Sequence, residues 1–92
     1  MYSGGAPLSE EIRLFCVAVF SCDIIECYGQ TEVAGCLTTT AAWDPAGGHV
    51  GGVLPCLRMH LKDIPNTNST SEKLCRGEIC VKGNSVMLGY YK

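Results

Sequence analysis

The chain has 92 residues, of which 47% are hydrophobic and 17% are charged, and its formal net charge is −2. This composition fits one small globular domain and excludes a disordered chain, while the weak acidity gives no electrostatic case for binding nucleic acid or an anionic membrane surface. The longest apolar stretch, LFCVAVFSC, is about half of the roughly 20 residues that a membrane-spanning helix needs, and the amino-terminal residues lack the basic and apolar regions of a signal peptide.

Seven cysteines are distributed along the chain, with no CxxC pair among them. The number is odd and several lie inside apolar runs, so we expect reduced thiols that pack as small hydrophobic side chains rather than a disulfide framework. His49 and His60 have no cysteine at zinc-binding spacing, which argues against a metal cluster. These patterns predict an intracellular protein in a reducing compartment.

The first predicted element is a helix over residues 9–20. Ser9 is a favourable N-cap, and two glutamates follow it in the first turn, where the helix dipole favours acidic side chains. Apolar residues recur at helical spacing from Ile12 to Phe20, and further apolar residues widen this face. We therefore expect a helix that is buried on more than one side.

The second predicted element is a strand at DIIEC, residues 23–27. Its continuous apolar, β-branched centre is typical of a parallel sheet covered by helices. The glycine-rich loop before the helix would end a preceding parallel strand. Both that loop and the turn after residue 27 are then expected at one sheet edge, where α/β proteins bind ligands.

The character of the sequence changes at Thr38, where a glycine- and proline-rich loop begins. Alternating residues predict a strand over 57–63 and a second over 77–83, paired antiparallel with the first. The residues expected to face inward in these two strands are Leu57, Met59, Leu61, Ile79 and Val81. The predicted segments are an αβ segment with ligand-binding loops (1–37), the connection (38–56) and an antiparallel β segment (57–92).

The segment YGQTE, residues 28–32, has two interpretations. In the first it is an ordinary solvated turn, in which Gly29 permits a positive φ. In the second it is a nucleotide site. Tyr28 would offer a flat face to a purine and Gly29 a close backbone approach, while Thr31 would supply donors for phosphate and Glu32 a hard oxygen ligand for Mg²⁺.

The upstream loop SGGAPLS favours the nucleotide interpretation, because its small residues leave room for a flat ring beside the second loop. Other residues suggest structural roles. Trp43 is expected to anchor its loop, and His49 either to order its loop or to approach a substrate. Tyr90 and Tyr91 are expected to be packing residues.

Four motifs, in this order and spacing, resemble those of the AMP-forming acyl-CoA synthetases of the adenylate-forming superfamily: SGGAPLS, YGQTE, GHVGGVLPC and RGEICVKGNSVMLGYYK. The second and third are similar in particular to eukaryotic long-chain fatty acid–CoA ligases. The likeness runs from Ser3 to Lys92, apart from a variable stretch at 64–74. The fold it implies is α/β: an internal fragment of the large amino-terminal domain, with the end of a helix-covered parallel sheet followed by the start of an antiparallel β subdomain.

The resemblance also implies an activity and a site. ATP with Mg²⁺ would activate a fatty acid to acyl-AMP, and coenzyme A would then displace AMP. The residues assigned to the adenine pocket are Gly4, Gly5, Ala6, Glu26, Cys27, Tyr28 and Gly29. Of these, Glu26 and Cys27 would contact the base largely through their backbone, and Tyr28 would pack on its face. Thr31 would bind the α-phosphate and Glu32 the metal, which makes these two the catalytic residues.

Several family motifs do not occur in this sequence: the phosphate loop, the Thr-Gly-Asp motif and the domain with the catalytic lysine. We therefore expect this fragment to be inactive without the remainder of the enzyme chain. The complete enzyme would associate with a membrane of the endoplasmic reticulum or peroxisome through segments outside this one. Three alternatives stay open: a ligase for another carboxylic acid, a non-catalytic nucleotide-binding module, and a small autonomous α+β domain without a ligand.

Overall fold

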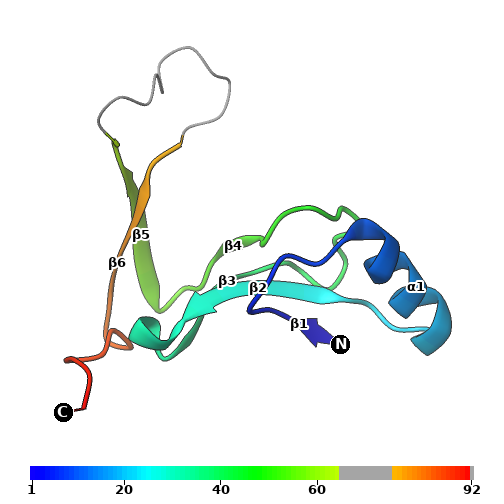
Figure 1. Cartoon of the computed structure of the whole chain (residues 1–92), viewed down its shortest axis with the longest axis horizontal. Helices are drawn as coiled ribbons and strands as arrows, with labels where there is room; N and C mark the ends of the chain where they lie inside the picture. The colour runs from blue at the N-terminus through cyan, green and yellow to red at the C-terminus, as the bar shows by residue number, and fades with distance from the viewer. Residues whose placement is uncertain (65–75, 92) are drawn as a thin grey trace.

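A computed structural model describes residues 1–64 and 76–91 of the chain, so the variable stretch and Cys75 lie outside the described residues apart from Ile64. Its strands form a mixed sheet in the order β1-β2-β3-β4 and an antiparallel pair, β5-β6 (Figure 1). In chain order the elements are β1 (Tyr2–Ser3), α1 (Glu10–Phe20), β2 (Ile25–Gln30), the 3₁₀ turn η1 (Thr31–Val33), β3 (Gly35–Thr39), β4 (Gly52–Val53), β5 (Leu57–Lys62) and β6 (Glu78–Gly83).

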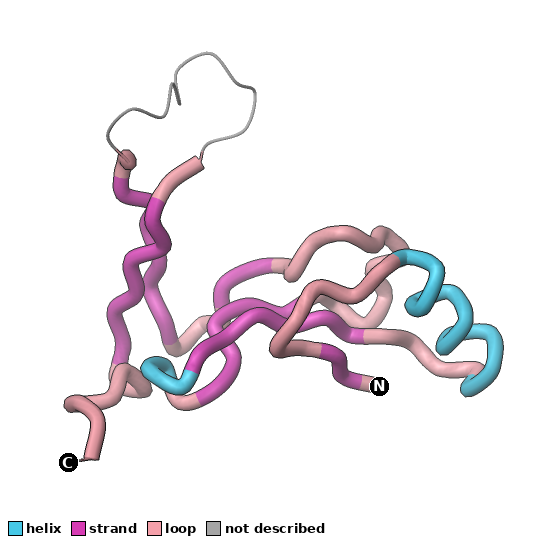
Figure 2. Tube along the Cα trace, in the orientation of Figure 1, coloured by secondary structure: helices cyan, strands magenta, loops and turns pink. Residues whose placement is uncertain are grey.

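The molecule is extended, with α1 at one end of the four-stranded sheet and the β5-β6 hairpin rising from the other (Figure 2). Its radius of gyration is 15.5 Å, whereas a compact domain of this length has about 12 Å. The buried hydrophobic residues among those described form one small cluster, Val33, Leu37 and Leu57, where η1, β3 and β5 meet. A core of this size leaves most apolar side chains with exposed surface.

The predicted helix is present, but the prediction that it is buried is wrong. Ser9 caps it, since its side chain accepts a hydrogen bond from the Ile12 N–H at 3.3 Å, and Ser21 ends it with a φ of 48°. None of the eleven residues of α1 is buried, and five of its large apolar side chains have exposed fractions between 53% and 63%: Ile12, Leu14, Phe15, Val19 and Phe20. An apolar face predicts a partner, but the described residues do not provide that partner.

The predicted strand after the helix is also present, although it continues further than expected. β2 pairs in parallel with β1 at Tyr2↔Ile25 and Ser3↔Glu26, so a parallel strand does precede the glycine-rich loop. The parallel sheet ends there, because the next strand, β3, is antiparallel to β2. β3 also runs across the predicted segment boundary at residue 37, and the division into three segments stays a prediction.

The hairpin of β5 and β6 pairs antiparallel as predicted, from Leu57↔Gly83 to Lys62↔Glu78. The predicted inward face is confirmed at Leu57, which is 7% exposed, and at Val81, which is partly buried against the core cluster. It is wrong at Met59, Leu61 and Ile79, whose exposed fractions are 38–42%. Because the hairpin projects from the sheet, only its base meets other elements (Figure 1).

The six described cysteines are free thiols, and none of them is fully buried, which corrects the expectation of buried packing. Among the described residues, no helix has the length and apolar character to cross a bilayer. Within the same residues, no three potential ligands from His, Cys, Asp and Glu gather around one point.

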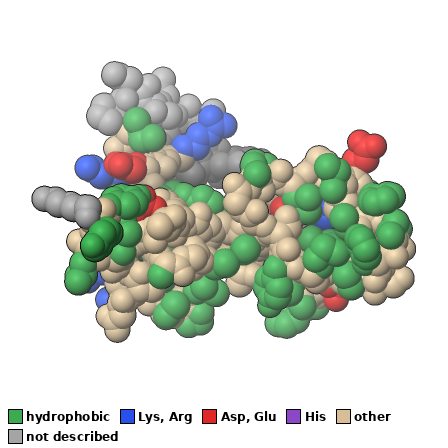
Figure 3. All heavy atoms as spheres, turned by 60° about the horizontal axis from the view of Figure 1, so that its bottom comes forward, with side chains coloured by type: hydrophobic (Ala, Val, Ile, Leu, Met, Phe, Trp, Pro, Cys, Tyr) green, Lys and Arg blue, Asp and Glu red, His purple; other side chains and the backbone are tan. Residues whose placement is uncertain are grey.

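We predict that the isolated 92-residue chain aggregates, because its apolar side chains gather over the end of the molecule that α1 occupies (Figure 3). Light scattering and size-exclusion chromatography would measure this. The double variant Phe15→Glu/Phe20→Glu removes apolar area from that end and should reduce the aggregated fraction. Glu11→Gln on the same helix is the matched control and should not. A monodisperse unmodified chain would contradict the prediction.

Candidate functional site

The parallel pairing of β1 with β2 brings the diglycine loop beside β2. The Cys27 thiol donates a hydrogen bond to the Ser3 carbonyl at 3.3 Å. A side chain at Gly4 would place its Cβ 2.7 Å from the Cys27 sulfur, and Gly5 adopts a φ of 86°. Glycine is therefore required at position 4 by close approach and at position 5 by backbone conformation.

Six of the seven residues assigned to the adenine pocket line one cavity of about 370 Å³. These are Gly5, Ala6, Glu26, Cys27, Tyr28 and Gly29. The volume lies within the range of ~300–1,000 Å³ that is usual for small-molecule sites. The two loops that the sequence analysis singled out thus share one concave surface, as the nucleotide interpretation requires.

A second cavity of about 530 Å³ adjoins the first, and the two have Gly5, Cys27 and Gly29 in common. Its lining includes Gly4, the remaining adenine residue, and Thr31, the residue assigned to phosphate. Thr31 therefore lines the cavity that adjoins the one lined by the adenine residues.

Gly29 is small for a reason that sequence reasoning did not identify. It is not among the residues with positive φ, so the turn interpretation is wrong on this point. Instead, Tyr28 and Gly29 continue β2, and the ladder to β3 has a bulge between them. A Cβ at position 29 would lie 1.8 Å from the Gly35 carbonyl oxygen. The positive φ values fall on Ala34 and Gly35 instead.

Hydrogen bonds and packing contacts fix the positions of Tyr28 and Glu26 on β2. Tyr28 packs against the small core, and its hydroxyl accepts a hydrogen bond from the Gln30 amide at 3.0 Å. Glu26 is 9% exposed, and its N–H donates to the Thr40 hydroxyl while its carbonyl accepts from the Thr40 N–H, each at 2.9 Å. The Glu26 N–H is thus already occupied, which leaves its carbonyl as the backbone group with remaining capacity to accept a hydrogen bond.

Glu32, the predicted metal ligand, is fixed from a distant part of the chain. The Tyr90 hydroxyl donates a hydrogen bond to its carboxylate across 58 residues of sequence, and the Met87 N–H donates to its carbonyl at 2.9 Å. The hydrogen bond from Tyr90 lowers the pKa of Glu32 below its ordinary value. Tyr90 is 70% exposed and Tyr91 fully exposed, so the prediction that both are packing residues is wrong.

The carboxylate of Glu32 suits a divalent cation. Glu32 is half-buried, and its lowered pKa keeps it ionised. A carboxylate has about four lone-pair sites, so the hydrogen bond from Tyr90 leaves it able to bind a metal. Magnesium is commonly held by one or two carboxylates together with substrate phosphates and water. Glu32 follows Thr31 directly in η1, although it is not part of the lining of either cavity. The residues present therefore fit Mg²⁺.

His49 has the structural role that was one of its two predicted roles, and it also lies at the candidate site. Its Nδ1 accepts a hydrogen bond from the Gly51 N–H at 3.1 Å, and its Nε2 lies 3.3 Å from an Asp44 carboxylate oxygen. Its side chain lines the first cavity together with Val50. The prediction for Trp43 as a loop anchor is wrong, because its side chain is 87% exposed. Sequence reasoning missed Val50, whose position in a glycine-rich loop gave no signal.

Residues 1–91 match the profile of the AMP-binding enzyme family. Because the match extends over almost the whole chain, the chain belongs to that family. This agrees with a strand–loop–strand arrangement that presents small residues, a tyrosine and a threonine to adjoining cavities.

Its curated relatives include long-chain fatty acid–CoA ligases. The chain is 40% identical over 92 residues to long-chain-fatty-acid–CoA ligase 5 of Mus musculus and 44% identical over 91 residues to ligase 6 of Homo sapiens. It is 39% identical over 94 residues to the peroxisomal long chain acyl-CoA synthetase 7 of Arabidopsis thaliana. The matches cover 98–100% of this chain but 13% of each relative.

Solved structures show the same fold. A benzoate CoA ligase from Burkholderia xenovorans LB400 superposes with a TM-score of 0.76 at 26% identity, over 98% of this chain and 18% of that one. O-succinylbenzoate coenzyme A synthetase from Bacillus subtilis, in complex with ATP and magnesium ion, gives a TM-score of 0.72 at 23% identity, over 97% and 18%. The mixed sheet, the single described helix and the small antiparallel sheet are thus a part of the adenylate-forming fold.

Proposed function

We propose that this chain supplies the adenine- and Mg²⁺-binding part of a long-chain fatty acid–CoA ligase, which activates a fatty acid with ATP to acyl-AMP and transfers the acyl group to coenzyme A. The observation that carries the proposal is the cavity shared by Gly5, Ala6 and Tyr28, adjoining the cavity that Thr31 lines. The similarity to long-chain ligases over the whole chain supports the substrate class.

In this proposal each residue acts on a different part of ATP. The adenine ring lies between the Gly5–Ala6 loop and Tyr28, where small residues admit it and the phenol ring gives apolar contact. Thr31 donates its hydroxyl to a phosphate oxygen, and Glu32 holds the metal. Bound Mg²⁺ supplies a Lewis acid that spreads the negative charge of the phosphates. Tyr90 keeps the Glu32 carboxylate ionised and oriented.

The proposed reaction needs groups that this chain does not supply, because the chain spans 13% of the relatives it matches. We therefore predict that the purified 92-residue chain forms no acyl-AMP from oleate, ATP and Mg²⁺, measured by thin-layer chromatography with labelled ATP. The longest gene product that contains these residues should form it under the same conditions. Acyl-AMP formation by the 92-residue chain alone would overturn the prediction.

A second candidate is a ligase for another carboxylic acid, which the superposition on a benzoate CoA ligase favours. Pyrophosphate release by the longest gene product with oleate, octanoate and benzoate would separate the two. A value of kcat/KM that is greatest for oleate supports the long-chain assignment, and one that is greatest for benzoate overturns it.

We further propose a reducing compartment inside the cell, which suits the six described free thiols. The peroxisomal relative from Arabidopsis thaliana supports the peroxisome as one location to test. Fractionation of cells that express the longest gene product would test both points.

A further inference from the structure

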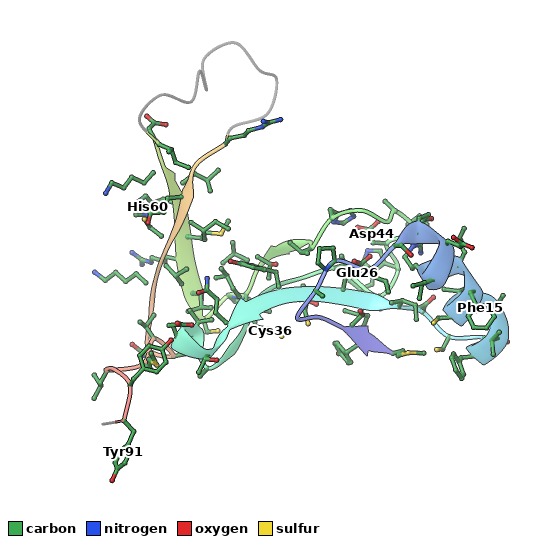
Figure 4. All side chains as sticks on the ribbon, in the orientation of Figure 1. Phe15, Glu26, Cys36, Asp44, His60 and Tyr91 are labelled. Carbon is green, nitrogen blue, oxygen red and sulfur yellow. The ribbon has the colours of Figure 1, made fainter. Side chains whose placement is uncertain are left out.

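Two cysteines lie on the paired strands β2 and β3. Cys27 is opposite Thr39 and Gly29 is opposite Cys36, with the bulge between Tyr28 and Gly29. Cys36 is therefore paired with the residue two positions beyond Cys27, which brings the two cysteines close together along the ladder. Both line the second cavity, and Cys36 is labelled at the junction of the strands in Figure 4.

The two thiols differ in their surroundings. Cys36 is exposed, so a reagent in solution can reach it. Cys27 is half-buried, and its thiol donates to the Ser3 carbonyl. A hydrogen bond with the Cys36 thiol, followed by burial, raises the pKa of Cys27. The exposed member therefore meets an oxidant first, and the covered member is placed to complete a disulfide.

The Cys27 thiol also supports the diglycine loop. Its sulfur occupies the space that a Cβ at Gly4 would need, and its S–H is the donor to Ser3. A disulfide has no S–H, so its formation would remove that hydrogen bond and draw the sulfur toward β3. The loop of Gly4 and Gly5 would then lose its support. Gly5 lines both cavities and Gly4 lines the second.

We propose that Cys27 and Cys36 are a peroxide-sensitive thiol pair whose disulfide weakens ligand binding in the adjoining cavities. The Cys36 thiol loses its proton and its sulfur attacks one peroxide oxygen; the O–O bond breaks, the departing hydroxide takes up a proton, and a sulfenic acid and water form. The Cys27 sulfur then attacks the Cys36 sulfur and gives up its proton; the S–O bond breaks, the departing hydroxide takes up a proton, and the disulfide and a second water form. Both sulfurs are oxidised and the peroxide is reduced. The effect on ATP rests on the proposed function, whereas the disulfide does not.

The test uses the longest gene product that contains the chain, first reduced and then treated with hydrogen peroxide. Free thiols are blocked with N-ethylmaleimide before cleavage after glutamate. Cleavage after Glu26 and Glu32 places Cys27 and Cys36 on separate peptides. Mass spectrometry should then find these two peptides joined, and dithiothreitol should separate them. Peroxide treatment that leaves both thiols open to N-ethylmaleimide would overturn the proposal.

Two variants make the test specific. Cys36→Ser should abolish the joined peptides, whereas Cys56→Ser, at the other exposed cysteine among the described residues, should leave them unchanged. We expect oxidation to weaken ATP binding about tenfold in the unmodified protein and in Cys56→Ser, but not in Cys36→Ser. If the disulfide forms and ATP affinity is unchanged, the coupling to the cavities is wrong. If the reduced protein binds no ATP, the proposed function fails while the joined peptides still establish the thiol pair.

Discussion

Glu32→Gln should lower the rate of acyl-AMP formation by roughly 10²- to 10³-fold in the longest gene product that contains this chain. The substitution preserves the size of the side chain and an oxygen that can accept the hydrogen bond from Tyr90. It removes the negative charge, which is the property that binding to Mg²⁺ requires. Pyrophosphate release at saturating oleate, measured over a range of Mg²⁺ concentrations, would show the loss.

Glu11→Gln is the matched control, because it makes the same substitution at an exposed glutamate on α1, and no residue of α1 lines either cavity. It should leave the rate unchanged. Tyr90→Phe should give a smaller loss that a higher Mg²⁺ concentration restores, because it removes the hydroxyl that orients Glu32 while leaving the carboxylate. If Glu32→Gln binds Mg²⁺·ATP as well as the unmodified protein, the non-catalytic nucleotide-binding module becomes the better assignment.

Local patterns in the sequence predicted the elements whose cause is itself local. Ser9 was predicted as an N-cap and forms that cap, and the alternation over residues 57–63 corresponds to β5. The antiparallel pairing of β5 with β6 also followed from two alternating runs joined by a polar stretch. In each case the residues that decide the structure are neighbours in the sequence.

Burial could not be predicted in the same way, because it depends on what lies opposite. The apolar face of α1 is a correct reading of periodicity, yet Phe15 is 63% exposed and lies at the end of the molecule away from β5 and β6 (Figure 4). Met59 and Leu61 alternate correctly along β5, but their strand projects beyond the sheet. Periodicity states which face of an element is apolar and says nothing about whether a second layer covers it.

The candidate site shows the same division. The two loops could be expected at one sheet edge because both lie near β1 or β2, which are parallel neighbours. The contact of Tyr90 with Glu32 could not, since 58 residues separate them and no local pattern links them. β3 was missed because Gly35 and Cys36 resemble the beginning of a loop, although the run of threonines from Thr38 is a β-branched signal that indicates a strand.

Gly29→Ala is expected to disrupt the candidate site by displacing β3 from β2. The added Cβ would lie 1.8 Å from the Gly35 carbonyl oxygen and 2.8 Å from the Cys36 Cα. Both atoms belong to backbone, so no side chain can rotate to make room, and the strands must separate at the bulge. Overpacking of this kind lowers the free energy of unfolding by about 1–3 kcal/mol. Thermal unfolding of the longest gene product would measure this loss.

The consequence for ligand binding follows from the position of Gly29, which lines both cavities. ATP binding should therefore weaken together with stability in Gly29→Ala, as isothermal titration calorimetry would show. Gly52→Ala is the matched control: Gly52 lies on β4, its φ is not positive, and a Cβ there meets nothing within 4 Å. Equal stability and ATP affinity of the two variants would mean that β2 and β3 do not approach as closely as the ladder requires. If Gly29→Ala lowers stability but leaves ATP affinity unchanged, the glycine serves the strand pairing alone. The adenine ring would then have to bind beside the Gly5–Ala6 loop without contact to β2.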